Sequence, residues 1–196
     1  MVIRNTSFSV EDLRGKDFED VTFLKCIFPA SEISFVSFQG CKFSMCDFSG
    51  CMLDMVRFSH CAFPESKLNY LDFSKTGIIA CDFGSVIAKN CIFQQLKEGS
   101  LFEKKKLDLR GNIFEHADLS GSIFAFANMS KTSFRYADLT RAVFERCDLK
   151  ETDFTQCKIE GAHFDTSSMK NTILDIQGFV QYGNSKGFVL EPPADS

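Results

Sequence analysis

The sequence predicts an all-β fold in which the chain winds as a solenoid and turns a corner every five residues. A large apolar residue, most often Phe, recurs every five positions, and a small residue lies two positions before nearly every one of them. A period of five fits neither a helix of 3.6 residues per turn nor a strand of period 2. Stacked turns would bury these residues in one continuous core, and 196 residues suffice for a substantial one.

The lattice of central residues has two runs. The first extends from Phe8 to Phe93 with one misfit, Ala88, and the second extends from Leu109 to Leu174 with none. Eighteen of the 23 Phe residues lie on these two runs. The two residues after each centre are mostly polar, small or charged, which predicts that they face outward.

All nine cysteines occupy the small position two residues before a centre, where Ala, Ser, Thr and Val also occur. They form no pair at zinc-ligand spacing, so we expect no metal site. If coils repeat every twenty residues, Cys41, Cys61 and Cys81 form a ladder within disulfide range. A role as inert, buried filler is the favoured alternative.

The tandem pattern resembles the pentapeptide-repeat family. Runs such as ADLSG (117–121), ADLTR (137–141) and CDFSG (46–50) match its repeat closely, and the resemblance covers roughly residues 6 to 176. It implies a right-handed quadrilateral β-helix with four repeats per coil, and therefore about eight coils. Phe alternates with aliphatic centres in the second run, so opposite faces would be uniformly Phe or uniformly aliphatic.

The expected organisation is a single structural domain with four parts: N-terminal coils (1–95), an inserted loop (96–106), C-terminal coils (107–176) and a capping or dimerisation tail (177–196). The loop reads LKEGSLFEKKK, two repeats plus one residue. It is either a tolerated loop or short helix over a corner, or a projecting loop that contacts a partner. The residues predicted to make that contact are Leu101, Phe102, Lys104, Lys105 and Lys106.

The tail departs from the repeat after Leu174. Residues 175–186 are compatible with a short helix that ends at Gly187, and residues 188–190 with a short strand. Four apolar or aromatic side chains of the tail lie outside the repeat and are expected to pack against another surface: Phe179, Tyr182, Phe188 and Leu190. They either cap the last coil of a monomer or, as the resemblance to Qnr- and MfpA-type members implies, form a two-fold homodimer through the tail.

Catalytic motifs are not found, so we expect no enzyme and no cofactor. The three histidines should face outward. Asp often precedes a centre, either as an acidic surface or as a turn-stabilising set, because Asp side chains bond nearby backbone groups. The candidate acidic surface comprises Asp47, Asp72, Asp82, Asp118, Asp138 and Asp148.

The sequence shows no leader-like or membrane-spanning segment, which predicts a cytoplasmic protein. Its net charge of −4 predicts that it does not bind nucleic acid directly. The resemblance to Qnr-, MfpA- and McbG-type members implies a DNA-mimicking protein. Such a protein binds DNA gyrase or topoisomerase IV and protects it from quinolones or other poisons. The alternative is a scaffold or interaction module for another partner, since fold does not determine function. A charge of −4 is modest for a DNA mimic.

Overall fold

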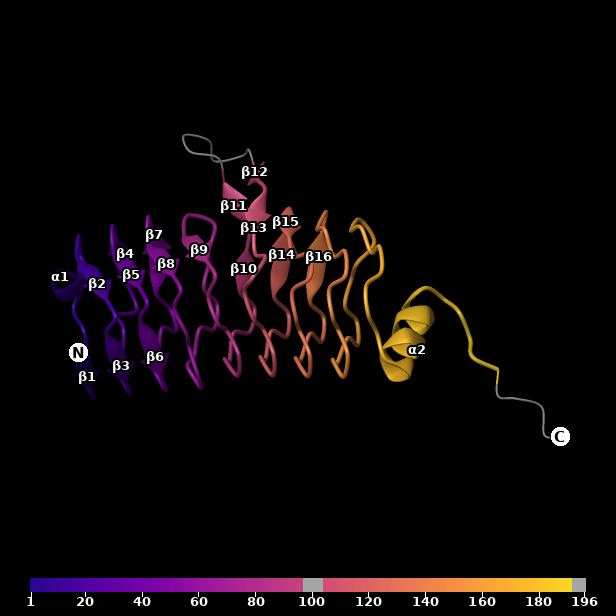
Figure 1. Ribbon diagram of the computed structural model, residues 1–196, viewed down its shortest axis with the longest axis horizontal. Coiled ribbons are helices and arrows are strands. Elements are labelled where there is room, and N and C mark those ends of the chain that lie inside the picture. The colour runs from indigo at the N-terminus through magenta and orange to yellow at the C-terminus, as the bar shows by residue number, and fades with distance from the viewer. Residues whose placement is uncertain (97–103, 192–196) are drawn as a thin grey trace.

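The protein is a straight, four-sided β-solenoid in the computed structural model, which describes residues 1–96 and 104–191 (Figure 1). Almost all strand pairings are parallel and join residues 20 apart, so one coil contains four repeats. Each repeat supplies one side of the coil, and the four sides stack into four faces that run the length of the rod.

Face 1 carries an unbroken series of paired positions: Val2, Thr22, Lys42, Ala62, Asp82, Ile113, Ser133, Asp153 and Ile173. Its strands are β1 (Val2–Arg4), β3 (Thr22–Leu24) and β6 (Lys42–Ser44). Face 2 is paired through single bridges at Ser7, Ile27, Asp47, Lys67, Ile87, Asp118, Asp138 and Lys158. Each step along these series is one coil.

Faces 3 and 4 carry most of the remaining strands. Face 3 contains β4 (Glu32–Ser34), β7 (Met52–Asp54), β10 (Ile92–Phe93), β14 (Ile123–Ala125) and β16 (Val143–Glu145). Face 4 contains β2 (Asp17–Glu19), β5 (Ser37–Gln39), β8 (Arg57–Ser59), β9 (Gly77–Ile79), β13 (Leu107–Asp108) and β15 (Ala127–Asn128). Face 4 is divided into two separate sheets, one ending at β9 and one starting at β13.

The corners explain why the period is five. Two residues after nearly every centre, the backbone adopts the left-handed conformation, with positive φ at non-glycine residues such as Asn5, Lys25 and Tyr136 and at glycines such as Gly111. This conformation is unfavourable for most residues, so a corner is a local conformational cost that packing must offset.

The core is a set of stacked columns. Along face 1, the rings of Phe114 and Phe134 are parallel with centroids 4.9 Å apart, and along face 3 those of Phe124 and Phe144 are 5.0 Å apart. Leu119 and Leu139 occupy face 2 in the same coils and are fully buried. For the second run, the prediction of uniform Phe faces opposite each other is therefore confirmed. The misfit Ala88 of the first run is buried as well.

The five-residue repeat is interrupted after Gln95. Across the interruption, the pairings on faces 1, 2 and 3 join residues 31 apart rather than 20, so eleven extra residues leave the coil and return to it. The bases of this insertion form an antiparallel pair, β11 (Gln95–Leu96) with β12 (Lys104–Lys105), that projects from the rod (Figure 1).

A helix lies at each end of the rod. At the start, α1 (Val10–Leu13) replaces a repeat side with one helical turn, because Ser9 and Asp12 form a capping box. At the end, α2 (Ile176–Ser185) begins after the N-cap Asp175 and is followed by Gly187 with φ of +83°. The predicted tail helix is confirmed, whereas the predicted strand at 188–190 is wrong: these residues form no ladder and only the Phe188 amide bonds back, to Gly183.

Within the described ranges, no helix is long and apolar enough to cross a bilayer, and α2 has ten residues.

Candidate partner-binding surface

The core of the described residues contains apolar side chains and free thiols. All nine cysteines are free and buried, and no group of three metal-ligating side chains occurs among the described residues. Where this position holds Cys or Ser, the side chain donates to a carbonyl of the preceding coil: the Cys61 thiol to Phe38 at 3.3 Å, and the Ser66 hydroxyl to Phe43 at 2.7 Å. Burial raises the pKa of the Cys91 thiol to about 12, so it is protonated and unreactive at neutral pH. We therefore place the candidate site on the outer surface.

The insertion contributes the most prominent part of that surface. Of the residues predicted to contact a partner, Lys104 and Lys105 form β12 and Lys106 is exposed beside it. Leu101 and Phe102 lie outside the described residues.

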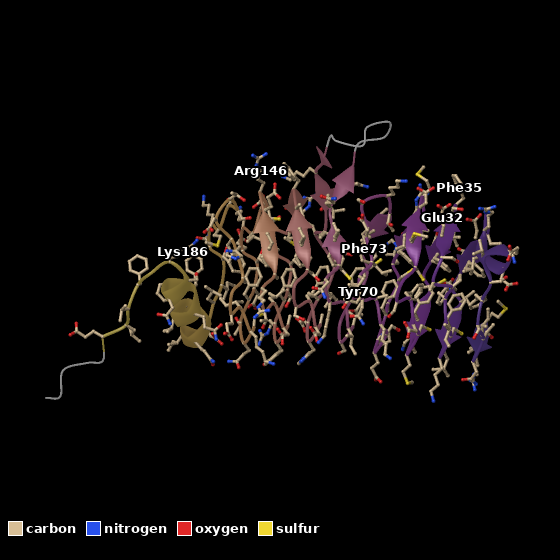
Figure 2. All side chains as sticks on the ribbon, turned by 180° about the vertical axis from the view of Figure 1, so that it is seen from behind. Glu32, Phe35, Tyr70, Phe73, Arg146 and Lys186 are labelled. Atoms are coloured by element: carbon tan, nitrogen blue, oxygen red, sulfur yellow. The ribbon has the colours of Figure 1, made fainter. Side chains whose placement is uncertain are left out.

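The hairpin emerges from the corner between faces 3 and 4, and the residues at this corner line one edge of the rod. We call them the hairpin edge: Phe35, Met55, Lys75 and Gln95 before the insertion, and Phe126 and Arg146 after it. Figure 2 shows Phe35 and Arg146 along this edge, on opposite sides of the hairpin.

Exposed apolar side chains gather on the N-terminal half of the hairpin edge. Phe35 is 61% exposed, Met55 is 52% exposed, and Met52 on the adjoining strand β7 is 60% exposed. On the C-terminal half, the guanidinium of Arg146 lies 5.3 Å from the centroid of the Phe126 ring. Aromatic, Met and Arg side chains are enriched in protein interfaces, so this edge has the composition of a binding surface.

Sequence reasoning missed the hairpin edge, although a signal was present. Only five Phe residues lie off the lattice: Phe35, Phe102, Phe126, Phe179 and Phe188. Phe35, Phe179 and Phe188 are exposed. A Phe at an outward position of a solenoid has no core to fill, which makes it a candidate contact residue.

The six predicted surface aspartates have a structural role in common. Each carboxylate accepts the backbone N–H two residues later, at 2.8 to 3.2 Å, as an Asx turn does. This geometry explains why Asp recurs before a centre.

These aspartates are distributed over the whole circumference. Asp47, Asp118 and Asp138 lie on face 2, whereas Asp72, Asp82 and Asp148 lie on faces 3, 1 and 4. Two of them are paired with lysine: Asp118 with Lys89 at 3.0 Å, and Asp138 with Lys158 at 3.4 Å. They do not line up as one acidic stripe.

The histidines do not form a site either. His60, His116 and His163 are all exposed, as expected, and lie on different coils. The His116 ring stacks on that of Tyr136 with centroids 4.7 Å apart, which makes it part of a surface column.

Of the four predicted tail residues, one packs on the last coil and three are exposed. Tyr182 packs edge-on against Phe164 of the last coil, with centroids 6.2 Å apart. Phe179, Phe188 and Leu190 are 67%, 72% and 71% exposed. The end of the solenoid is capped by polar atoms as well, since the Asp175 carboxylate accepts the Gln156 amide at 3.0 Å and the Gln181 carbonyl accepts the Ile159 amide at 3.2 Å.

Comparisons with known proteins agree with this architecture. The family model for pentapeptide repeats (8 copies) matches residues 31–69, 107–140, 127–165 and 147–175, which is more than half of the chain. No curated protein sequence matches.

Solved structures with a similar fold include QnrB1, a plasmid-mediated fluoroquinolone resistance protein. A trypsin-treated variant of it has a TM-score of 0.60 and 17% identity over 98% of this chain and 99% of that chain. The full-length form has a TM-score of 0.42 and 18% identity over 94% and 96%. HetL, a pentapeptide repeat protein involved in heterocyst differentiation regulation in the cyanobacterium Nostoc, has a TM-score of 0.28 and 17% identity over 89% and 87%. By its repeats and its fold, the chain belongs to the pentapeptide-repeat family.

Proposed function

We propose that this protein binds a type II DNA topoisomerase, gyrase or topoisomerase IV, and protects it from quinolones or other topoisomerase poisons. The observation that carries the proposal is a fold shared with QnrB1 over nearly the full length of both chains. The protein would act without catalysis, as a rod that occupies a site on the enzyme.

The hairpin and the hairpin edge supply the contact in this proposal. Phe35, Met52 and Met55 expose apolar surface that a partner would remove from water. Lys106, which is exposed beside β12, would meet a carboxylate at the rim of the interface, where charge guides orientation and association rate.

DNA mimicry is the second part of the proposal. A rod with outward carboxylates can enter a cationic DNA-binding groove. Because the aspartates are spread over four faces and partly paired with lysine, we assign them a supporting role beside the hairpin edge.

A supercoiling assay tests the proposal. Relaxed plasmid, purified gyrase and ATP are combined with an inhibitory amount of a quinolone, and the protein is added at rising concentration. We expect supercoiling to recover. No recovery at micromolar concentrations of folded protein would contradict the proposal.

Paired variants locate the contact in the same assay. Replacing Phe35 and Met55 together by Ser should weaken protection at least tenfold. Ile27→Ser is the matched control, since Ile27 is 55% exposed on face 2, away from the hairpin edge. Equal loss in both variants would argue against the hairpin edge.

We also propose that a second copy of the chain covers the C-terminal tail. Ile176, Phe179, Phe188, Val189 and Leu190 expose apolar surface at one end of the rod, and monomeric proteins rarely expose large contiguous apolar patches. Sedimentation equilibrium should show a dimer, and Phe179→Asp with Leu190→Asp should dissociate it. A wild-type monomer at all concentrations would leave the tail as a simple cap.

The alternative function is a protein-interaction module with a partner other than a topoisomerase. The scattered, lysine-paired aspartates favour it over mimicry of a uniformly charged duplex. In that case the Phe35 and Met55 variant would still lose partner binding, while gyrase would be unaffected by the wild-type protein.

A further inference from the structure

Among the described residues, strand pairing is missing at two steps of the solenoid: from β7 to Asp72 on face 3, and from β9 to β13 on face 4. Where β9 meets β13 on face 4, the described residues show no strand pairing, although the same step is paired on face 1 (Asp82 with Ile113), face 2 (Ile87 with Asp118) and face 3 (Ile92 with Ile123). The insertion enters between faces 3 and 4, so it interrupts the wall at this point.

The backbone groups at this step lack the bonds that their equivalents make. On face 1, the Phe83 amide donates to the Ile113 carbonyl at 2.8 Å, the Ser85 amide to the Glu115 carbonyl at 2.9 Å, and the Ile113 amide to the Cys81 carbonyl at 3.1 Å. On face 4, the corresponding amides of Ile78, Ala80 and Asp108 make no such bond across the step within the described ranges. Unpaired strand edges are templates for another extended chain.

One of the buried polar atoms marks the same place. Among the described side chains, two buried polar atoms have no hydrogen-bond partner, Thr76 Oγ1 and Asn112 Nδ2. Thr76 immediately precedes β9, and Asn112 lies at the following corner, beyond β13. Equivalent hydroxyls donate to the carbonyl 23 residues earlier, which for Thr76 is Leu53 of β7, so Thr76 belongs to the step before β9. Across the insertion the Ser122 hydroxyl donates to the Ala88 carbonyl, and the equivalent acceptor for Asn112 is the Ile78 carbonyl of β9, so the unsatisfied Asn112 amide lies at the β9–β13 step.

The open step forms a depression of about 350 Å³ at the base of the hairpin. Its apolar lining comes from Ile78, Ile79, Ala80 and Leu107, and its polar lining from Gln95, Lys106, Asp108 and Arg110. This volume is at the lower end of the range for ligand pockets.

The charges of the depression favour an anionic occupant. Arg110 and Asp108 neutralise each other through a two-point ion pair, at 2.6 and 2.9 Å. Lys106 makes no ion pair in the described part of the chain and is exposed. One uncompensated positive charge therefore remains beside an apolar floor.

We infer that this depression is a peptide-binding site for a short extended segment of a partner protein that carries an acidic residue next to a large apolar one. Its backbone carbonyls would accept the free amides of the strand edge, as in strand addition. Its apolar side chain would contact Ile79 and Leu107, and its carboxylate would lie near Lys106. The site is independent of the topoisomerase proposal and would hold for any partner with such a segment.

Hydrogen exchange tests the premise on the free protein. The amides of Ile78, Ala80 and Asp108 should exchange at least tenfold faster than those of Phe83, Ser85 and Ile113. Equal protection of the two sets would show that the step is closed and would overturn the inference.

A displayed library of random twelve-residue peptides tests the site itself. Selected peptides should share an acidic residue beside a large apolar one. Ile79→Lys and Lys106→Glu should each reduce their affinity at least tenfold, while the controls Ile27→Lys and Lys67→Glu, both on face 2, should not. Ile27 and Ile79 have nearly equal exposure, 55% and 52%. Selection of no binder, or of binders indifferent to the two variants at the depression, would refute the site.

Discussion

At the scale of single residues, the inward small position shows how one site tolerates several residue types. Thr152 donates its hydroxyl to the Met129 carbonyl at 2.8 Å, as Cys and Ser do at equivalent positions. Thr76 occupies the same position without a partner for its hydroxyl. Two threonines in equivalent positions should therefore respond in opposite ways to substitution.

Replacing Thr76 by Val should stabilise the fold by about 1 kcal/mol, because a buried, unsatisfied hydroxyl is removed without loss of a hydrogen bond. Replacing Thr152 by Val should destabilise it by about 1 kcal/mol, because the Met129 carbonyl loses its donor. Urea unfolding of both variants measures the difference. A loss of stability at Thr76 equal to that at Thr152 would mean that its hydroxyl is satisfied.

The buried thiols predict instability at alkaline pH. Burial raises the pKa of Cys51, Cys91 and Cys157 from 9.0 to about 12. Above pH 9, unfolded chains lose thiol protons that the folded chain retains, so the free energy of unfolding should fall as pH rises toward 12.

Each such thiol contributes at most ~1.4 kcal/mol per pH unit to this fall. Replacing Cys51, Cys91 and Cys157 together by Ser should therefore flatten the alkaline limb of the stability profile, measured by urea unfolding at several pH values. An unchanged slope would argue that the thiols are not protected in the folded state.

At the scale of elements, the C-terminal cap replaces the missing neighbour of the last coil. Asp175 has two functions at once, since its carboxylate accepts the Gly178 amide of α2 at 2.7 Å and the Gln156 amide of the last coil at 3.0 Å. The helix and the coil are thus held by one side chain.

Asp175→Ala should lower the free energy of unfolding by roughly 1–2 kcal/mol, because it removes an N-cap and leaves a coil amide without an acceptor. Thermal unfolding measures this loss, with Glu160→Ala as an exposed control of the same kind. If both variants lose the same amount, Asp175 has no special role.

The repeat itself could be predicted from the sequence. Each side of every coil needs a large apolar residue in the core, so the same residue types recur every five positions. The tail helix was predictable from its boundary residues for a similar reason. The turn at α1 was not, since Leu13 fits the repeat and only the Ser9–Asp12 capping box redirects the backbone. The strand predicted at 188–190 failed because an apolar run forms a strand only where an edge is available to pair with it.

At the scale of the whole molecule, the outer surface is harder to predict than the core. The spread of Asp residues around the rod depends on which face each repeat occupies, and that becomes clear only when coils of twenty residues are aligned. The open step on face 4 depends on how the chain leaves and re-enters the wall at Gln95 and Leu107. No local pattern encodes such a long-range consequence.

Deletion of residues 96–106 should restore the lattice, because Phe93 to Gln95 would then be followed by Leu107 to Leu109 in unbroken steps of five. We expect a folded rod in which β9 pairs with β13, with a melting temperature equal to or above that of the wild type. Circular dichroism and thermal unfolding measure this. An unfolded or strongly destabilised product would show that the insertion is needed for folding.

The central claim is that function depends on the hairpin and its surroundings rather than on the regular coils. The most direct test compares the wild-type protein with the 96–106 deletion in the quinolone-inhibited gyrase supercoiling assay, at equal concentrations of folded protein. We predict that the wild type restores supercoiling and that the deletion variant, although folded, does not. Equal protection by both would contradict the claim and would assign the activity to the coils themselves.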